Sequence, residues 1–163
     1  MERTTILEDL KKYWKENDLP QDGGESELFN KAKVGRFSFR YPNLNGKALL
    51  LHDINHFLTG YTTTWKGEFQ VSAWELASGG RKGFPTTWIY PISLTVLGLL
   101  FYPRQTISAY KSGLGKRNSF IIYKQTDIFS LTIDEIKNYS KANKTATNMG
   151  LWQVGLTEVI EHQ

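Results

Sequence analysis

The chain of 163 residues contains no cysteine. Disulfide bonds, thiolate metal sites and a cysteine nucleophile are therefore excluded. The sequence also lacks a strong excess of one charge. The formal net charge is only +4 and there is no long basic run, so nucleic acid is not an expected partner. The N-terminus lacks the apolar core of a signal peptide. We expect a cytoplasmic protein, with peripheral contact at the inner face of the cell membrane as an alternative.

Basic residues nevertheless gather in two short stretches, residues 31–40 and 111–124. We interpret them as solvated surface or, alternatively, as an attraction for an anionic head group or a membrane surface. No part of the sequence resembles a P-loop, a dinucleotide-binding glycine motif or a nucleophile elbow. These common catalytic motifs therefore do not explain the protein.

Hydrophobic periodicity predicts an all-α protein with one domain over residues 1–163, a helical bundle with a central apolar pocket. Only Ser119–Tyr123 resembles a β-strand, and it is too short to imply a sheet. Threonines at 62–64 and at 132 are expected to cap the starts of two helices. The predicted helices cover residues 6–14, 26–33, 47–58, about 65–78, 91–102, a segment beginning near 132, and 150–161.

Residues 84–102 carry no charge and have about the length of a membrane-crossing helix. Pro85 and Pro91, together with several Ser and Thr residues, argue against a span. The remaining alternatives are a buried core helix and a helix that lines a lipid pocket or touches a membrane. Gly98 would allow another helix or a ligand to approach closely. The residues predicted to line a lipid pocket are Trp88, Ile92, Leu94, Leu97 and Leu99.

Two of the three histidines stand four residues apart in the segment HDINH. On a helix with about 3.6 residues per turn, His52, Asp53 and His56 share one side. Glu68 follows after eleven residues, and the break at Gly60 lets two helices pack antiparallel, which brings Glu68 opposite the histidines. Imidazoles and carboxylates bind divalent metals, so His52, Asp53, His56 and Glu68 are predicted to form a metal site.

The alternative interpretation of these residues is a buried polar network without metal, in which the side chains hydrogen-bond to one another. Glu75, seven residues beyond Glu68, lies on nearly the same helix face. A zinc-protease motif would need Glu where Asp53 stands, and a phosphohydrolase of the H…HD…D type would need a histidine before His52. If a metal binds, mixed His and carboxylate ligands favour Zn, with Fe, Mn and Mg as alternatives.

The same residues resemble a known family. HDxxH followed after eleven residues by Glu is the motif of the ubiquinone (coenzyme Q) biosynthesis protein COQ-four family, and His52, Asp53, His56 and Glu68 match it position by position. The short chain without a leader resembles a bacterial member. The resemblance covers about residues 30–142. Further similar stretches are Gly67-Glu68, Gly83-Phe84-Pro85, Ala109–Gly113 and the segment from Glu135 to Ser140, whereas Asn138 and Lys141 depart from an expected arginine pattern.

The resemblance implies an all-α protein with a divalent metal and a long apolar pocket for a prenyl or fatty chain. The family oxidatively removes the C1 carboxyl of a prenylated aromatic precursor of ubiquinone, a decarboxylase or lyase-like activity, and it organises other quinone-biosynthesis enzymes near a membrane. We expect Asp53 and Glu68 to be the catalytic residues and a prenylated aromatic or long-chain lipid to be the partner. The alternatives are a non-catalytic prenyl-lipid-binding or scaffold protein of a quinone or isoprenoid pathway, and a metal-free structural helical protein.

Overall fold

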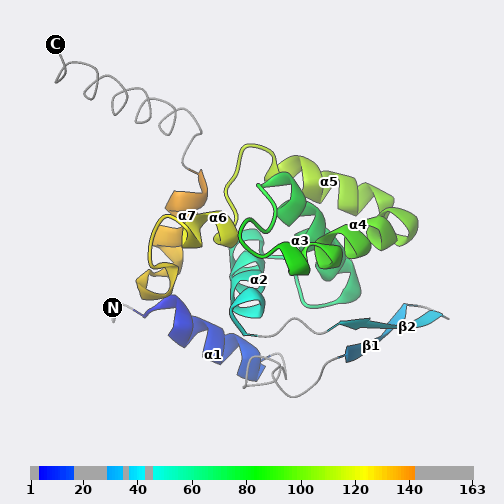
Figure 1. Ribbon diagram of the computed structural model, residues 1–163, viewed down its shortest axis with the longest axis horizontal. Helices are drawn as coiled ribbons and strands as arrows, with labels where there is room; N and C mark the ends of the chain where they lie inside the picture. The colour runs from blue at the N-terminus through cyan, green and yellow to red at the C-terminus, as the bar shows by residue number, and fades with distance from the viewer. Residues whose placement is uncertain (1–3, 17–28, 35–36, 43–45, 142–163) are drawn as a thin grey trace, which may run out of the picture.

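The computed structural model describes residues 4–16, 29–34, 37–42 and 46–141, and it confirms the all-α class (Figure 1). The predicted helix over 150–161 lies outside these residues. The helices of the described part are α1 (Ile6–Glu16), α2 (Gly46–Thr59), α3 (Trp65–Ala77), α4 (Ile89–Phe101), α5 (Pro103–Gly113), α6 (Ser119–Tyr123) and α7 (Ile133–Lys141), with short 3-10 helices η1 (Pro85–Thr87) and η2 (Ile128–Ser130).

The ends of the central helices follow the predicted caps. The Thr64 hydroxyl accepts a hydrogen bond from the Gly67 backbone N–H at the start of α3. After α2, Gly60 has φ of 72° and its N–H donates to the His56 carbonyl at 2.8 Å. Glycine adopts this left-handed conformation without steric strain, so Gly60 ends the helix. Thr132 and Glu135 form the predicted capping box before α7, with the Thr132 N–H donating to Glu135 Oε2 at 2.9 Å.

Two local predictions are wrong. The sequence predicts a helix over 26–33, but residues Phe29–Val34 form strand β1, which pairs antiparallel with β2 (Phe37–Pro42) in a small hairpin, and residues 26–28 lie outside the described part. Aromatic residues at every second position of β2 carry the period of a strand. Conversely, the β-like run Ser119–Tyr123 is helix α6, because Asn118 caps it and burial of Phe120 and Ile122 outweighs the strand preference of isoleucine.

The helices form two hydrophobic clusters that meet at α2 and α3. α1, α2, α6 and α7 share the larger cluster, centred on residues such as Leu10, Leu51 and Ile136. α3 packs against α4 and α5, where Phe69 and Leu94 are the buried centre of the second cluster. α2 and α3 are neighbours in Figure 1, between the two groups. Polar side chains on their facing sides therefore lie deep in the protein.

The uncharged segment forms η1 and α4 and is buried on one side only. Pro91, Leu94 and Gly98 are buried there. A Cβ atom on Gly98 would lie 2.7 Å from Phe69 Cβ and 2.7 Å from Thr106 Oγ1, so this glycine allows α4 to approach α3 and α5 closely. Among the described residues, no helix combines the length and apolar character needed to cross a membrane.

Candidate metal centre

Three of the four predicted ligands come together between α2 and α3. His52 and His56 lie one turn apart on α2, and Glu68 lies in the first turn of α3. His52 Nε2 is 3.1 Å from Glu68 Oε2, and His56 Nε2 is 3.2 Å from Glu68 Oε1. One ligand atom from each residue lies within 4.8 Å of the others. In a tetrahedral zinc site with bonds of about 2.0–2.1 Å, ligand atoms stand roughly 3.4 Å apart, so this group can hold one divalent ion.

The orientation of His56 fits a metal ligand. Its Nδ1 is 2.9 Å from the Tyr61 carbonyl oxygen. A carbonyl oxygen only accepts, so Nδ1 carries the proton and donates it, and Nε2 is the nitrogen that faces Glu68. His56 Nε2 is buried and makes no hydrogen bond. Its neighbour there is the Glu68 carboxylate, with Oε1 at 3.2 Å, and a metal ion between the two groups would bind both.

Electrostatics couple the two histidines to the carboxylates. Burial by itself lowers the pKa of His52, but the Glu75 and Glu68 carboxylates outweigh this and raise the pKa to about 10. Burial also lowers the pKa of His56, but the Glu68 carboxylate outweighs burial, so the pKa of His56 is raised as well. For Glu68, burial favours the neutral form, yet His56 and His52 bring its pKa below the ordinary value. Without a bound metal, protonated histidines and an ionised Glu68 therefore stabilise one another.

The fourth predicted ligand, Asp53, lies outside the three-residue group. Its Oδ2 accepts a hydrogen bond from Trp14 Nε1 of α1 at 2.6 Å. Burial raises the pKa of the Asp53 carboxyl, while the neighbouring His52 and the Trp14 hydrogen bond oppose the shift. Sequence spacing correctly places Asp53 on the same side of α2 as the histidines. The position of α1, which spacing does not reveal, decides that its carboxylate bonds to tryptophan.

Several residues of the site were not predicted. The spacing places Glu75 on nearly the same face of α3 as Glu68 but does not predict its partner, which is His52 Nδ1 at 2.7 Å. Arg81 and Asn55 hydrogen-bond to the Glu75 carboxylate. Tyr13 of α1 also lies near the site, with its ring centre 6.5 Å from that of His56. Burial and the carboxylates of Asp53 and Glu68 raise the pKa of its phenol. A buried arginine beyond a Gly-Gly turn carries no local signal of its place, so only the tertiary structure reveals Arg81.

The predicted lipid-pocket residues lie in different environments. Leu94 is buried against Phe69, and Leu97 packs beside this pair. Trp88 is half-buried and its Nε1 donates to the Arg81 carbonyl at 3.0 Å. Ile92 and Leu99 are exposed, each at 45%. A cavity of about 300 Å³ occurs elsewhere, near the ends of α2, α5 and α7, and its lining residues are Leu58, Thr59, Tyr61, Trp74, Ser112, Lys116, Lys137, Ser140 and Lys141.

Comparison with known proteins finds no family model, no curated protein and no solved structure that matches this chain.

Proposed function

We propose that this chain is a metal-dependent enzyme that oxidatively removes the ring carboxyl of a prenylated aromatic acid as carbon dioxide, with dioxygen as the two-electron oxidant. The observation that supports the proposal most is the His52, His56 and Glu68 group, whose ligand atoms lie within 4.8 Å of one another. Two histidines and one carboxylate are typical of catalytic metal sites that keep coordination positions open for substrate. The resemblance of the HDxxH and Glu spacing to the ubiquinone-biosynthesis family supports the substrate class.

The donor set suits zinc, and it equally suits ferrous iron, which uses two histidines and one carboxylate in oxygen-dependent enzymes. When bound, such a metal supplies a Lewis acid or electron acceptor with open positions. The chain itself provides the orientation of the ligands. His52 and His56 have side chains only 5% and 1% exposed, whereas Glu68 is 21% exposed. We therefore expect the substrate ring to approach from the Glu68 side of the group.

In this proposal Glu68 has the leading role among the predicted catalytic residues. It is the carboxylate between the two imidazoles, and it is the member of the group that solvent reaches. Asp53 is buried and bound to Trp14, so we propose that it positions α1 against α2 and does not touch the substrate.

The apolar tail of the substrate has a candidate docking surface on α4. Ile89, Ile92, Val96, Leu99 and Leu100 recur at helical spacing and are exposed by 45% or more. A surface of this kind is unusual on a protein without a partner. We propose that α4 touches the membrane peripherally, where a prenylated substrate resides.

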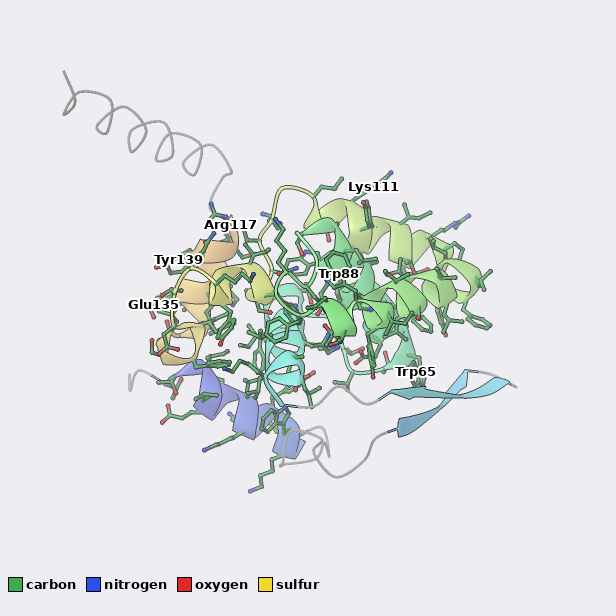
Figure 2. The ribbon with its side chains drawn as sticks, viewed as in Figure 1. Trp65, Trp88, Lys111, Arg117, Glu135 and Tyr139 are labelled. Atoms are coloured by element: carbon green, nitrogen blue, oxygen red, sulfur yellow. The ribbon has the colours of Figure 1, made fainter. Side chains whose placement is uncertain are left out.

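Charge supports the same assignment. Residues 76–126, which include α4 and α5, contain no Asp or Glu, and they carry seven basic residues. Lys111 extends outward from α5 (Figure 2). Basic side chains near an apolar surface favour a membrane with anionic lipids, each contributing about 1 kcal/mol close to the surface. The basic residues of this segment are Arg81, which is buried, and Lys82, Arg104, Lys111, Lys116, Arg117 and Lys124.

A non-catalytic lipid-binding or scaffold protein is the second candidate, and the exposed face of α4 favours it because this face needs no metal. A complementation experiment separates the two. In cells without their own C1-decarboxylating activity, the wild-type protein is expected to lower the carboxylated prenyl-ring intermediate, measured by mass spectrometry, and Glu68→Gln is not. Gln keeps the size of the side chain but removes its negative charge. Equal rescue by both proteins would show that the negative charge of Glu68 is not needed for the reaction. Rescue by neither would favour the scaffold function, because a scaffold supplies no decarboxylating activity of its own.

A further inference from the structure

A second carboxylate, Glu75, lies behind His52 on the side away from Glu68. Its side chain is fully buried, as is that of Arg81. Neither belongs to the three-residue ligand group. We propose that Glu75, held in place by Arg81 and Asn55, is a positioning residue that fixes His52 with Nε2 directed at the metal. This inference rests on the proposed metal site.

Both oxygens of Glu75 are held by donors. Oε1 lies 2.7 Å from His52 Nδ1 and accepts a hydrogen bond from Asn55 Nδ2 at 2.8 Å. Oε2 accepts from Arg81 Nε at 2.9 Å and pairs with Arg81 Nη2 at 2.8 Å. The carboxylate therefore has little freedom to rotate, and the imidazole that donates to it is held in one orientation.

These contacts select the tautomer of His52. If Nδ1 carried no proton, a nitrogen lone pair and a carboxylate oxygen would face each other at 2.7 Å, which is repulsive. With a proton on Nδ1, His52 donates to Glu75 and Nε2 is free to bind a metal. Arg81 Nη2, 3.2 Å from the same Nδ1, cannot accept a proton, so Glu75 is the acceptor that decides the orientation.

The support behind Glu75 is itself anchored. The Arg81 guanidinium lies 5.1 Å from the Phe120 ring centre and 5.6 Å from that of Tyr90. The side-chain oxygen of Asn55, Oδ1, accepts a hydrogen bond from the Ser119 N–H at 2.9 Å. The network thus joins α2, α3, α4 and α6. Buried ion pairs are weak sources of stability, so one that also holds a metal ligand suggests a functional reason for its presence.

The two histidines are supported differently. His56 donates to a neutral backbone carbonyl, that of Tyr61, whereas His52 donates to a charged carboxylate. A carboxylate behind an imidazole makes the ligand nitrogen more basic, and losing such a support typically weakens metal binding about 10- to 100-fold. We therefore expect His52 to depend on Glu75 for its strength as a ligand.

The test measures zinc affinity of the full chain by competition with a chromophoric chelator. Glu75→Gln is expected to bind zinc about 10- to 100-fold more weakly than the wild type. Glu135→Gln is the matched control. Glu135 is the capping-box carboxylate of α7 and lies at the left in Figure 2, so its replacement affects a helix end and not the surroundings of His52. Its zinc affinity is expected to equal that of the wild type.

A second measurement needs no variant. In zinc-loaded wild-type protein, nitrogen-15 NMR of the His52 ring is expected to show Nδ1 protonated and Nε2 bound to zinc. If Nδ1 is the bound nitrogen, or if Glu75→Gln binds zinc as tightly as the wild type, the positioning role is refuted while the metal centre stands. If the wild type binds no divalent metal, the proposed metal centre fails and this inference fails with it. Should Glu75→Gln not fold, the NMR result decides.

Discussion

The indole nitrogen of Trp14 lies 2.6 Å from Asp53 Oδ2, and this hydrogen bond joins α1 to the helix that carries both histidines. Trp14 and Asp53 are both buried. The contact explains why one of the four predicted metal ligands is not part of the three-residue group. It also assigns Asp53 a task that can be separated from metal binding by experiment.

Trp14→Phe is expected to lower the free energy of unfolding by about 1–3 kcal/mol, because the Asp53 carboxylate keeps its burial and loses its donor. Zinc content per folded chain is expected to stay that of the wild type. Urea unfolding and metal analysis of the same preparation check both statements. Loss of the metal together with a small change in stability would contradict this separation of the Trp14–Asp53 contact from metal binding.

The double substitution of His52 and His56 by alanine is expected to abolish binding of divalent metal, whereas the wild type holds close to one ion per chain. Two of the three members of the ligand group are removed by this change. His162, the remaining histidine, lies outside the described residues, and His162→Ala serves as the control with unchanged metal content. Stoichiometric metal in the double variant would refute the assignment.

Stability of the metal-free protein is expected to fall at alkaline pH. The pKa of His52 rises from 6.5 to about 10 on folding, because the Glu75 and Glu68 carboxylates outweigh its burial. A raised pKa contributes stability that is complete below pH 6.5 and is lost as pH rises through about 10. Urea unfolding in the presence of a chelator, followed over this range, is expected to show a steeper decline for the wild type than for His52→Gln. Parallel curves would contradict the ion pairing of His52.

The α4 surface is expected to bind anionic vesicles. Leu100, which is 72% exposed, is the test position, and Leu100→Glu should reduce co-sedimentation with vesicles that contain phosphatidylglycerol. Leu7→Glu on α1 is the matched control, since Leu7 is also an exposed leucine, at 38%. Binding should weaken with added salt, because salt screens the basic residues. If Leu100→Glu binds vesicles as well as the wild type, the membrane contact lies outside α4. If the wild type self-associates and Leu100→Glu does not, the partner of the α4 surface is a second copy of the chain.

Gly98→Ala is expected to lower the free energy of unfolding by about 1–3 kcal/mol, as overpacking of a well-packed core does. The added methyl group would lie 2.7 Å from Phe69 Cβ and from Thr106 Oγ1, so α4 must move away from α3 and α5. Ser93→Ala, at an exposed position of the same helix, should change stability by less than about 0.5 kcal/mol. Thermal and urea unfolding measure both variants, and equal stability would mean that the helices separate without cost.

Much of the helical fold follows from local signals. Thr64 and Gly60 mark the boundaries of α3 and α2, and Thr132 with Glu135 marks the start of α7, because caps satisfy backbone groups within a few residues. Hydrophobic period and helix geometry also place His52 and His56 on one side of α2. The failures lie where these signals compete. The lysines of Phe29–Val34 are compatible with a helix and with a strand, so the local pattern does not decide between them. In α6, burial overrides the strand preference of the isoleucines.

The sequence by itself therefore determined the all-α class, the main helix ends and the two histidines on one helix face, since all of these depend on neighbours along the chain. Only the tertiary structure decided which carboxylates meet them. Glu68 closes the ligand group, Asp53 bonds to Trp14, and Glu75 pairs with Arg81 behind His52. Each outcome depends on how α1, α3 and the turn after α3 pack on α2. Packing of distant segments is set by the fit of whole surfaces, which no residue spacing encodes.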